Sequence, residues 1–419
     1  MYKAPRGTAD VLPAEQPYWQ YVQTKALEIS DRFGYRRIDT PVFEDANLYI
    51  RGVGEGTDIV EKETYTFKDK GGDIISLRPE GTAGVCRAYV EHSMASLPQP
   101  VRLHYMESFF RYERPQAGRF RPFHQFGVEA IGDGDASIDA EVIELGWQFI
   151  KGLGLGNMTL VLNSIGDKEC RPLYLKTLRE HYAANLHRIC PDCKMRFKKN
   201  LLRVLDCKRT DFACQEVLSA APKATEFLCA PCKEHWDELN TYIKALGIPM
   251  VINHKLVRGL DYYTRTVFEI QPQEEGAQST ILAGGRYDGL IEELGGKPTP
   301  GVGFATGIER IILNLKRQNI TVPAAEPYKV MIAHLGKAAD VEAVALASEL
   351  RKAGISAAVA SGGKSLKAQM RQISSLEAQM AIIIGDNEIA QRSVVVRDMA
   401  KATQQTVAMA DIVKFIKNS

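Results

Sequence analysis

Arginine residues beside glycine and aromatic residues recur at three places in the chain. Arg111 lies in the string FFRYERPQ, Arg258 precedes Gly259 in VRGLDYY, and Arg310 lies in the first turns of the helix-like string GIERIIL. A buried guanidinium is costly unless an anion meets its planar fork of donors, although a single arginine is more often a surface ion-pair partner. Three arginines in such settings therefore favour a site for a polyphosphate.

Cysteine residues are the second group that could do chemistry, because six of the eight lie between positions 190 and 232. Two C-x-x-C pairs in a reduced compartment match the spacing of a tetrahedral structural zinc site, which leaves no position open for water. The candidate zinc ligands are Cys190, Cys193, Cys229 and Cys232. Cys207 or Cys214 could replace a member, and the alternative is that all six are buried or surface thiols.

Two glycine-rich strings resemble nucleotide-binding loops, but neither has the required spacing. GGKS at 362–365 resembles the end of a Walker A loop, yet Ala358 stands where the first glycine is needed. GVGFATG at 301–307 spaces its glycines as G-x-G-x-x-x-G, which is not the dinucleotide-binding pattern. We therefore interpret such strings as tight turns before helices.

Length and composition are those of a folded protein with more than one domain. The chain has 419 residues, of which 45% are apolar and 25% charged, and 53 Lys and Arg stand against 51 Asp and Glu, for a net charge of +2. This balance excludes a wholly basic nucleic-acid binder but not a local basic patch. The N-terminus lacks a signal-peptide pattern and no run approaches about 18 apolar residues, so we expect a cytoplasmic protein without membrane contact.

Strands joined by hairpins are the elements that we expect to position Arg111. Residues 15–33 predict an amphipathic helix that starts after Pro13 and ends before Gly34. After an extended segment at 35–44, strand-like runs lie around KDKGGD and on both sides of the charged loop at 114–121. Hairpin-linked strands indicate an antiparallel sheet rather than an alternating βαβ fold.

Different patterns follow in the second half of the chain. The cysteine-rich block predicts helices, strands resume at 260–271 and 279–285, and a Pro-containing linker spans 320–328. The remaining segment alternates strand and helix, which predicts an α/β unit with mostly parallel strands. The expected domains are 1–325, with a helical insertion at about 170–248, and 326–419.

Longer strings resemble the histidyl-tRNA synthetases, a family of class II aminoacyl-tRNA synthetases. GYRRIDTPVFE, FFRYERPQAGRFRPFHQFGVE and GVGFATGIERIIL resemble the three class motifs, and LRPEGTAG, LVRGLDYYTRTVFE and AGGRYDGL resemble the more specific strings of this family. The resemblance runs from RGTADVLP to the C-terminal helix. It implies an α+β fold, in which an antiparallel-sheet catalytic domain with a helical insertion precedes a C-terminal α/β anticodon-binding domain.

The activity implied by this resemblance is ATP-dependent charging of tRNA(His) with L-histidine. The histidine carboxylate would attack the α-phosphorus of ATP, and the terminal ribose hydroxyl of the tRNA would then attack the histidyl-adenylate. Positioned cations should dominate both steps, and Mg²⁺ is expected on the outgoing phosphates. The resemblance makes Arg258 and Arg111 catalytic, and it assigns ATP binding to Arg111, Glu113, Arg119 and Arg310.

The histidine-binding residues implied by the family come from three strings. They are Glu80, Gly81, Thr82, Gln125, Glu129, Tyr262 and Tyr263. The residues alone leave other roles open, because Glu80 and Thr82 could cap a helix that begins at Gly81. Adjacent residues of one strand point to opposite faces, so Tyr262 and Tyr263 could also serve as core and surface side chains.

Partners of the chain are also suggested by charge and by the resemblance. Residues 186–236 contain ten Lys and Arg against six Asp and Glu, for a net charge of +4. In the family this insertion lies over the tRNA acceptor stem, but a solvated helix face explains the same charge. The first class motif implies a homodimer, so the expected partners are L-histidine, ATP, tRNA(His) and a second copy.

Two other classes of function compete with the enzyme. A regulatory subunit of ATP phosphoribosyltransferase has a synthetase-like fold without aminoacylation, and it typically lacks the C-terminal domain and parts of the histidine-specific strings. A nucleic-acid-binding module derived from a synthetase would tolerate loss of the ATP-binding arginines. Because Arg111, Arg258 and Arg310 are present and a further unit follows the linker, the sequence favours the enzyme.

Overall fold

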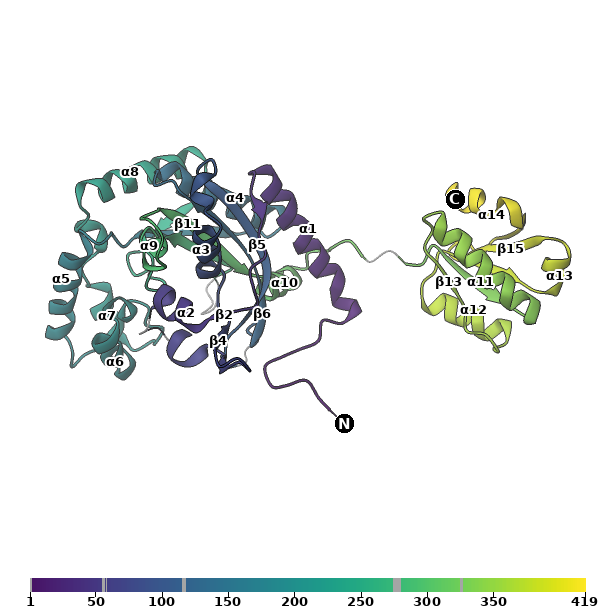
Figure 1. Ribbon diagram of the computed structural model, residues 1–419, viewed down its shortest axis with the longest axis horizontal. Helices are drawn as coiled ribbons and strands as arrows, with labels where there is room; N and C mark the ends of the chain where they lie inside the picture. The colour runs from purple at the N-terminus through teal and green to yellow at the C-terminus, as the bar shows by residue number, and fades with distance from the viewer. Residues whose placement is uncertain (1, 55–56, 58, 115–117, 274–279, 325–326) are drawn as a thin grey trace. The chain divides into compact units, whose positions relative to one another are not determined.

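A computed structural model describes residues 2–54, 57, 59–114, 118–273, 280–324 and 327–419. They fall into two units, Met1–Pro323 and Ala324–Ser419 (Figure 1). Three sequence predictions lie partly outside the described residues. They are the domain boundary at 325/326 with its linker, the loop at 114–121, and the first residue of the strand at 279–285.

The first unit is built on an eight-stranded sheet in the order β1-β5-β6-β11-β10-β9-β7-β8. Among the described strands, its pairings are antiparallel except for β1 with β5 and β7 with β8. The antiparallel sheet predicted from hairpins is therefore confirmed. The strands are β1 (Arg36–Arg37), β5 (Val101–Phe110), β6 (Pro122–Ile131), β7 (Met158–Ser164), β8 (Met250–Ile252), β9 (Thr264–Pro272), β10 (Leu282–Arg286) and β11 (Gly301–Gly307).

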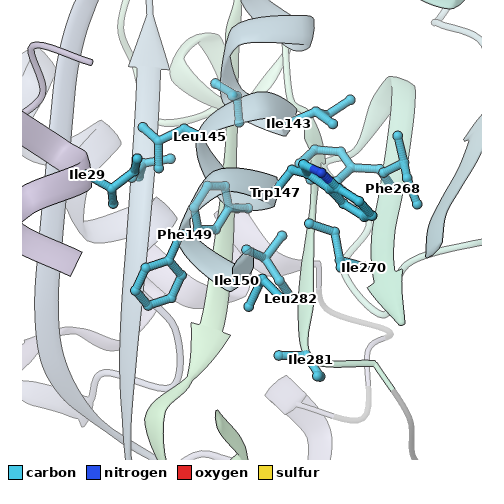
Figure 2. Packing of buried hydrophobic residues seen from close by; sticks show 14 of the residues in the cluster. Ile29, Ile143, Leu145, Trp147, Phe149, Ile150, Phe268, Ile270, Ile281 and Leu282 are labelled. Atoms are coloured by element: carbon cyan, nitrogen blue, oxygen red, sulfur yellow. The ribbon is translucent and has the colours of Figure 1, made fainter. Parts of the chain in front are cut away.

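One face of this sheet is packed against helices from distant parts of the chain. Trp147 and Ile150 of the central helix lie towards Phe268 and Ile270 of β9 in a buried apolar cluster (Figure 2). Phe149 of the same helix packs against Phe126 of β6. This helix reads apolar on nearly all sides because it is enclosed by the sheet and by its neighbouring helices. The four helices of this layer are α1 (Gln16–Arg32), α4 (Ala136–Gly152), α8 (Ala230–Ala245) and α10 (Ile308–Arg317).

A buried ion pair ties α4 to the end of β10. The Arg286 guanidinium and the Asp139 carboxylate are both fully buried, and Arg286 Nε lies 3.0 Å from Asp139 Oδ2. His235 Nε2 of α8 lies 3.3 Å from the other carboxylate oxygen. Burial alone would raise the pKa of Asp139, but Arg286 and His235 lower it well below its usual range. AGGRYDGL therefore contains a structural arginine.

The insertion between β7 and β8 consists of helices and short helical turns. It contains α5 (Arg171–Ala184), α6 (Pro191–Lys199), η4 (Leu201–Val204), α7 (Phe212–Ser219), η5 (Ala224–Glu226) and α8. A small separate sheet, β2-β4-β3, precedes it in the chain. The remaining elements of this unit are η1 (Pro13–Glu15), β2 (Phe43–Asp45), α2 (Ala46–Val53), η2 (Ile59–Glu63), β3 (Thr66–Lys68), β4 (Ile74–Leu77), α3 (Thr82–Glu91), η3 (Met94–Ser96) and α9 (Leu290–Glu293).

The second unit has a five-stranded sheet in the order β13-β12-β14-β15-β16. In β12, Val330 and Ile332 face the cluster that contains α11, whereas Met331 and Ala333 face α12. Only two of the four pairings are parallel, so the prediction of mostly parallel strands is wrong. The elements are β12 (Val330–His334), α11 (Lys337–Lys352), β13 (Ala357–Val359), α12 (Leu366–Ser375), β14 (Met380–Ile384), α13 (Asp386–Ala390), β15 (Ser393–Asp398), β16 (Gln404–Ala408), η6 (Met409–Asp411) and α14 (Ile412–Lys417).

The two glycine-rich strings have different structures. GGKS is a turn before α12, as predicted, and the Ser365 hydroxyl accepts a hydrogen bond from the backbone of Ala368. GVGFATG is not a turn but the strand β11, so that prediction is wrong. None of the helices among the described residues is both long and apolar enough to span a membrane.

Candidate active site

A cavity of about 700 Å³ opens on the sheet face opposite α4. Its wall is formed by the segment before α3, by β5, β6, β9, β10 and β11, by α10, and by residues 203–208 and 253–263. Most of the predicted site residues line it. They are Glu80, Gly81, Thr82, Arg111, Glu113, Arg119, Gln125, Arg258, Tyr262, Tyr263 and Arg310.

Strand alternation explains how β6 supplies both the core and the cavity. Phe126 and Val128 point into the helix-covered core, whereas Phe123 and Gln125 line the cavity. Glu129, the remaining predicted histidine-binding residue, is only 1% exposed and does not line the cavity. It lies directly behind the wall.

Glycines on the cavity side of the sheet leave room for this carboxylate. Gly303 of β11 pairs with Glu129 of β6, and a Cβ atom at Gly303 would collide with the Glu129 carboxylate. A Cβ atom at Gly127 would likewise collide with the Tyr105 ring. Gly301 and Gly303 of GVGFATG are therefore explained by close approach of the Tyr287 and Glu129 side chains, not by a turn.

Buried hydrogen bonds join Glu129 to neighbouring elements. The Thr82 hydroxyl donates to Glu129 Oε1 over 2.7 Å, and the Tyr287 hydroxyl donates to Oε2 over 2.6 Å. Burial raises the pKa of Glu129 to about 8, and the nearby Glu80 carboxylate adds to this rise. A cation can bind beside Glu80 and Glu129, because its charge would offset the desolvation of the two carboxylates and their mutual repulsion.

Glu80 has the capping role that the sequence left open. Its two carboxylate oxygens accept hydrogen bonds from the backbone N–H groups of Thr82 and Ala83, each over 2.8 Å, at the start of α3. The residue is nevertheless part of the cavity wall. Glu80 therefore both caps α3 and lines the cavity, because the first turn of α3 faces the cavity.

Tyr262 and Tyr263 both reach the cavity. They lie in the turn before β9, which begins only at Thr264, so the strand rule of opposite faces does not apply to them. Their ring centroids are 4.6 Å apart, and the Tyr262 hydroxyl lies 3.4 Å from Glu80 Oε2. The two rings therefore lie together, close to the carboxylate of Glu80.

Arginine side chains occupy another part of the same cavity. Arg119 Nη1 lies 3.2 Å from Glu113 Oε2, and Arg310 Nη1 donates to the Thr280 carbonyl over 2.7 Å. Burial lowers the pKa of Arg310, and the positive charge of Arg119 lowers it further. Two guanidinium groups that repel each other in one cavity form a site for an anion.

Arg111 and Arg258 also line the cavity that contains Arg119, Arg310 and the carboxylate of Glu80. Arg111 donates from Nε to the Pro79 carbonyl over 2.8 Å, directly before Glu80, and its guanidinium also lies 4.0 Å from Glu113. Arg258 lies over the Tyr263 ring, 5.9 Å from its centroid. Positive guanidinium groups and a buried carboxylate therefore line one cavity together.

Glu269 is a site residue that sequence reasoning missed. Its Oε1 accepts from Arg258 Nη1 over 2.5 Å, and its Oε2 accepts from the Thr280 hydroxyl over 2.6 Å and from Gln271 over 2.5 Å. These contacts fix the orientation of Arg258. The signal was present in the sequence, because Glu269 ends the string LVRGLDYYTRTVFE and faces the same side of β9 as Gln271.

The predicted zinc ligand set is wrong. The two C-x-x-C pairs do not meet, because each pair lies in a different group of potential metal ligands. Cys190 and Cys193 gather with Cys207 and Cys214, whereas Cys229 and Cys232 gather with Asp167 and Cys170. The first pair begins α6 and the second begins α8, and these helices lie in different parts of the insertion.

An antiparallel sheet with a cavity that holds arginines beside buried carboxylates, followed by a separate α/β unit, defines a class II aminoacyl-tRNA synthetase. The family model described as histidyl-tRNA synthetase matches residues 7–311, and the model described as anticodon binding domain matches residues 329–419. The chain belongs to the histidyl-tRNA synthetase family.

Individual relatives agree over their whole length. The histidine–tRNA ligase of Dehalococcoides mccartyi (strain ATCC BAA-2266 / KCTC 15142 / 195) is 55% identical over 417 residues, which cover 100% of this chain and 99% of the relative. That of Desulforamulus reducens is 48% identical over 413 residues, covering 99% and 98%. The crystal structure of apo S. aureus histidyl-tRNA synthetase superposes with a TM-score of 0.83 at 37% identity, covering 100% of both chains.

Proposed function

We propose that the cavity is the place where this chain performs its family's reaction. The chain charges tRNA(His) with L-histidine, in a reaction driven by ATP. One observation carries the assignment to the cavity: Arg111 and Arg258 line the same cavity as Arg119, Arg310 and the buried Glu80 carboxylate. That charge pattern suits the phosphates of ATP next to the ammonium of an amino acid.

Histidine activation is the first step. A carboxylate oxygen of histidine attacks the α-phosphorus of ATP, a P–O bond to the β-phosphate breaks, and pyrophosphate leaves. We assign Arg111 and Arg258 to the α-phosphate, because charge gathers there in the transition state and both side chains line the same cavity. Glu269 acts through Arg258 as a positioning residue.

We propose that the other arginines of the cavity bind the β- and γ-phosphates. Arg310 would hold the γ-phosphate, and Arg119 with Glu113 would complete the ATP contacts. The family uses ATP with Mg²⁺, which neutralises charge on the departing pyrophosphate. Arginine suits these positions because it stays charged and binds two oxygens at once.

Transfer to tRNA is the second step. The terminal ribose hydroxyl of the tRNA attacks the acyl carbon of histidyl-adenylate, the bond to the phosphate oxygen breaks, and AMP leaves. The basic insertion is the part of the first unit that we assign to the acceptor stem. The unit that matches the anticodon binding domain would contact the other end of the tRNA.

Histidine recognition is assigned to the carboxylate group and to β6. Glu80 and Glu129 would attract the ammonium, and Thr82 would contact it from the wall. Gln125 Oε1 is buried and has no hydrogen-bond partner among the described residues, so it can accept from an imidazole N–H. A site with polar groups left unpaired rejects analogues that cannot satisfy them.

A second copy of the chain is the remaining proposed partner. The segment that resembles the first class motif leads into the small sheet, where Phe43, Phe67 and Ile74 are between 45% and 60% exposed. Large apolar side chains gathered on one sheet are typical of an interface. We place the homodimer in the cytoplasm, where the thiols of the insertion would stay reduced.

Exchange of labelled pyrophosphate into ATP tests the proposal. We expect exchange that depends on histidine and is not supported by the other amino acids. Exchange without histidine, or with a different amino acid, would contradict the assignment. The regulatory role in ATP phosphoribosyltransferase is less supported, because both the ATP-binding arginines and the anticodon-binding unit are present.

A further inference from the structure

The cysteines of the insertion converge at two separate points. We name cluster one for Cys190, Cys193, Cys207 and Cys214, and cluster two for Asp167, Cys170, Cys229 and Cys232. Within each cluster the four potential ligand atoms all lie within 4.8 Å of one another. No disulfide joins any of these cysteines.

The sulfur positions of cluster one match a tetrahedral metal site. Cys190 Sγ lies 3.7 Å from Cys207 Sγ, Cys193 Sγ lies 3.7 Å from Cys214 Sγ, and the Sγ atoms of Cys207 and Cys214 are 4.0 Å apart. Four sulfurs bound to zinc at about 2.3 Å in a tetrahedron are about 3.8 Å from one another. Three of the sulfur–sulfur distances are therefore close to those of a tetrahedral zinc site, and the four sulfurs all lie within 4.8 Å of one another.

The local backbone of cluster one also favours thiolates. Cys190 caps the N-terminus of α6, and the N–H group of Cys193 points at its sulfur over 3.5 Å. Backbone N–H groups at a helix start are oriented towards negative charge, so this end of α6 suits a metal ligand with negative charge.

Cluster two has a different composition but the same closed form. Asp167 Oδ1 lies 3.5 Å from Cys170 Sγ and 3.9 Å from Cys229 Sγ. Three thiolates and one carboxylate around Zn²⁺ carry a charge of about −2. Arg265, which lies 3.5 Å from Asp167 Oδ2, and Arg171, which follows Cys170 directly, supply two positive charges beside it.

We propose that each chain binds two zinc ions, one in each cluster. Both sites are structural, because four protein ligands leave no position for water or substrate. Cluster one would fix the segment before α7, in which Leu205, Asp206 and Cys207 belong to the cavity wall. Cluster two would clasp the two ends of the insertion, and Arg171 beside it donates to the Tyr263 carbonyl over 2.6 Å.

The test is the metal content of the full chain, purified without chelators and with zinc in the growth medium. We expect two zinc ions per chain in the unaltered protein. Cys193→Ser and Cys232→Ser should each retain one, and the double variant none. Cys86→Ala is the matched control, because this buried cysteine lies in α3 outside both clusters, and it should retain two.

Other outcomes overturn the proposal. Loss of all zinc in Cys232→Ser alone would show one shared site, and metal-free protein with two reactive thiol clusters would show that neither is a metal site. Should a variant fail to fold, zinc released from the unaltered chain by a mercurial reagent gives the same count. Cobalt substitution adds a spectroscopic readout, because thiolate-bound tetrahedral Co²⁺ absorbs strongly and should reach saturation at two equivalents.

Discussion

At the scale of single residues, the protonation of Glu129 is a consequence of burial. Behind the cavity wall, the carboxyl group meets two neutral donors and one neighbouring carboxylate, but no cation among the described residues. Its raised pKa contributes stability below the ordinary value of 4.5, and this contribution is lost as the pH rises through about 8. The free chain thus holds a proton that the ammonium of histidine would displace.

Histidine affinity should therefore rise with pH. Because only the ionised carboxylate attracts an ammonium, we expect affinity to increase about tenfold between about pH 6.5 and about pH 8. Isothermal titration in two buffers of different ionisation enthalpy should also detect proton release on binding at neutral pH. Titration of the imidazole of free histidine contributes in the same range, so a reference variant is needed.

Glu129→Gln supplies that reference, because it keeps the shape and removes the titration. It should bind histidine more weakly at pH 8 and with a smaller pH dependence than the unaltered chain. Equal pH dependence in both proteins would show that Glu129 does not sense the ammonium.

Arg258 is the residue on which activation depends most directly in our proposal. Arg258→Ala should reduce histidine-dependent pyrophosphate exchange by about 100- to 1,000-fold, the usual effect of removing one donor from a developing charge. The fold should remain intact, as judged by circular dichroism. Arg114→Ala is the matched control, because Arg114 is exposed and does not line the cavity. Normal exchange in Arg258→Ala would refute its role.

Site residues within short strings could be predicted from the sequence, but the pairing of residues far apart in the chain could not. The resemblance located Arg111, Arg258 and Arg310, and the structure brings all three to one cavity. A C-x-x-C spacing identifies two local partners, but it says nothing about which pairs converge. That choice depends on where α6 and α8 start in the folded insertion, which no spacing rule contains.

At the scale of elements, β10 and α4 are held together by charge rather than by apolar contact alone. Asp139→Asn should lower the free energy of unfolding of the first unit by about 3–5 kcal/mol, because buried Arg286 would lose its fully buried counter-ion and keep only the partly exposed Asp288. Trp fluorescence during urea denaturation isolates this unit, since Trp19, Trp147 and Trp236 all lie in it.

A double variant separates the ion pair from packing. Asp139→Leu combined with Arg286→Met removes both charges, and it should recover most of the lost stability. If Asp139→Asn lowers the free energy of unfolding by less than about 1 kcal/mol, the buried ion pair contributes little to stability.

The elements themselves were predictable where their pattern was local. The hairpins and the helix α1 follow from alternation, caps and turn residues that the sequence shows directly. β11 was missed because its Gly303 leaves room for Glu129 on the neighbouring strand, and a local pattern does not show such a contact. β16 was missed because Gln404–Ala408 is a mostly exposed edge strand with few apolar residues.

At the scale of the whole molecule, the small sheet predicts the oligomeric state. Phe43→Asp should convert a homodimer to a monomer, because a charge in an apolar interface is costly. Sedimentation equilibrium measures this directly. Phe212→Asp is a fitting control, since Phe212 is 80% exposed in the insertion and lies outside the small sheet. A monomeric unaltered chain would contradict the proposal.

The division into two units predicts that histidine activation requires only the first unit, whereas charging of tRNA(His) requires both. A chain that ends at Pro323 retains every residue of the cavity wall, so it should keep histidine-dependent pyrophosphate exchange within about threefold. Charging of tRNA(His) should fall at least about tenfold, because a contact worth 1.4 kcal/mol already has that effect. Equal losses in both assays would argue against separate roles.

Glycine contacts beneath the cavity also bear on efforts to recode this enzyme for unnatural amino acids. Gly127 and Gly303 are already in contact with Tyr105 and Glu129, so neither position can accept a side chain that reshapes the floor. Room for a larger substrate has to come from the turn that carries Tyr262 and Tyr263, which no sheet pairing constrains. Libraries randomised there and at Gln125 should yield altered specificity, whereas libraries at the glycines should yield unfolded protein.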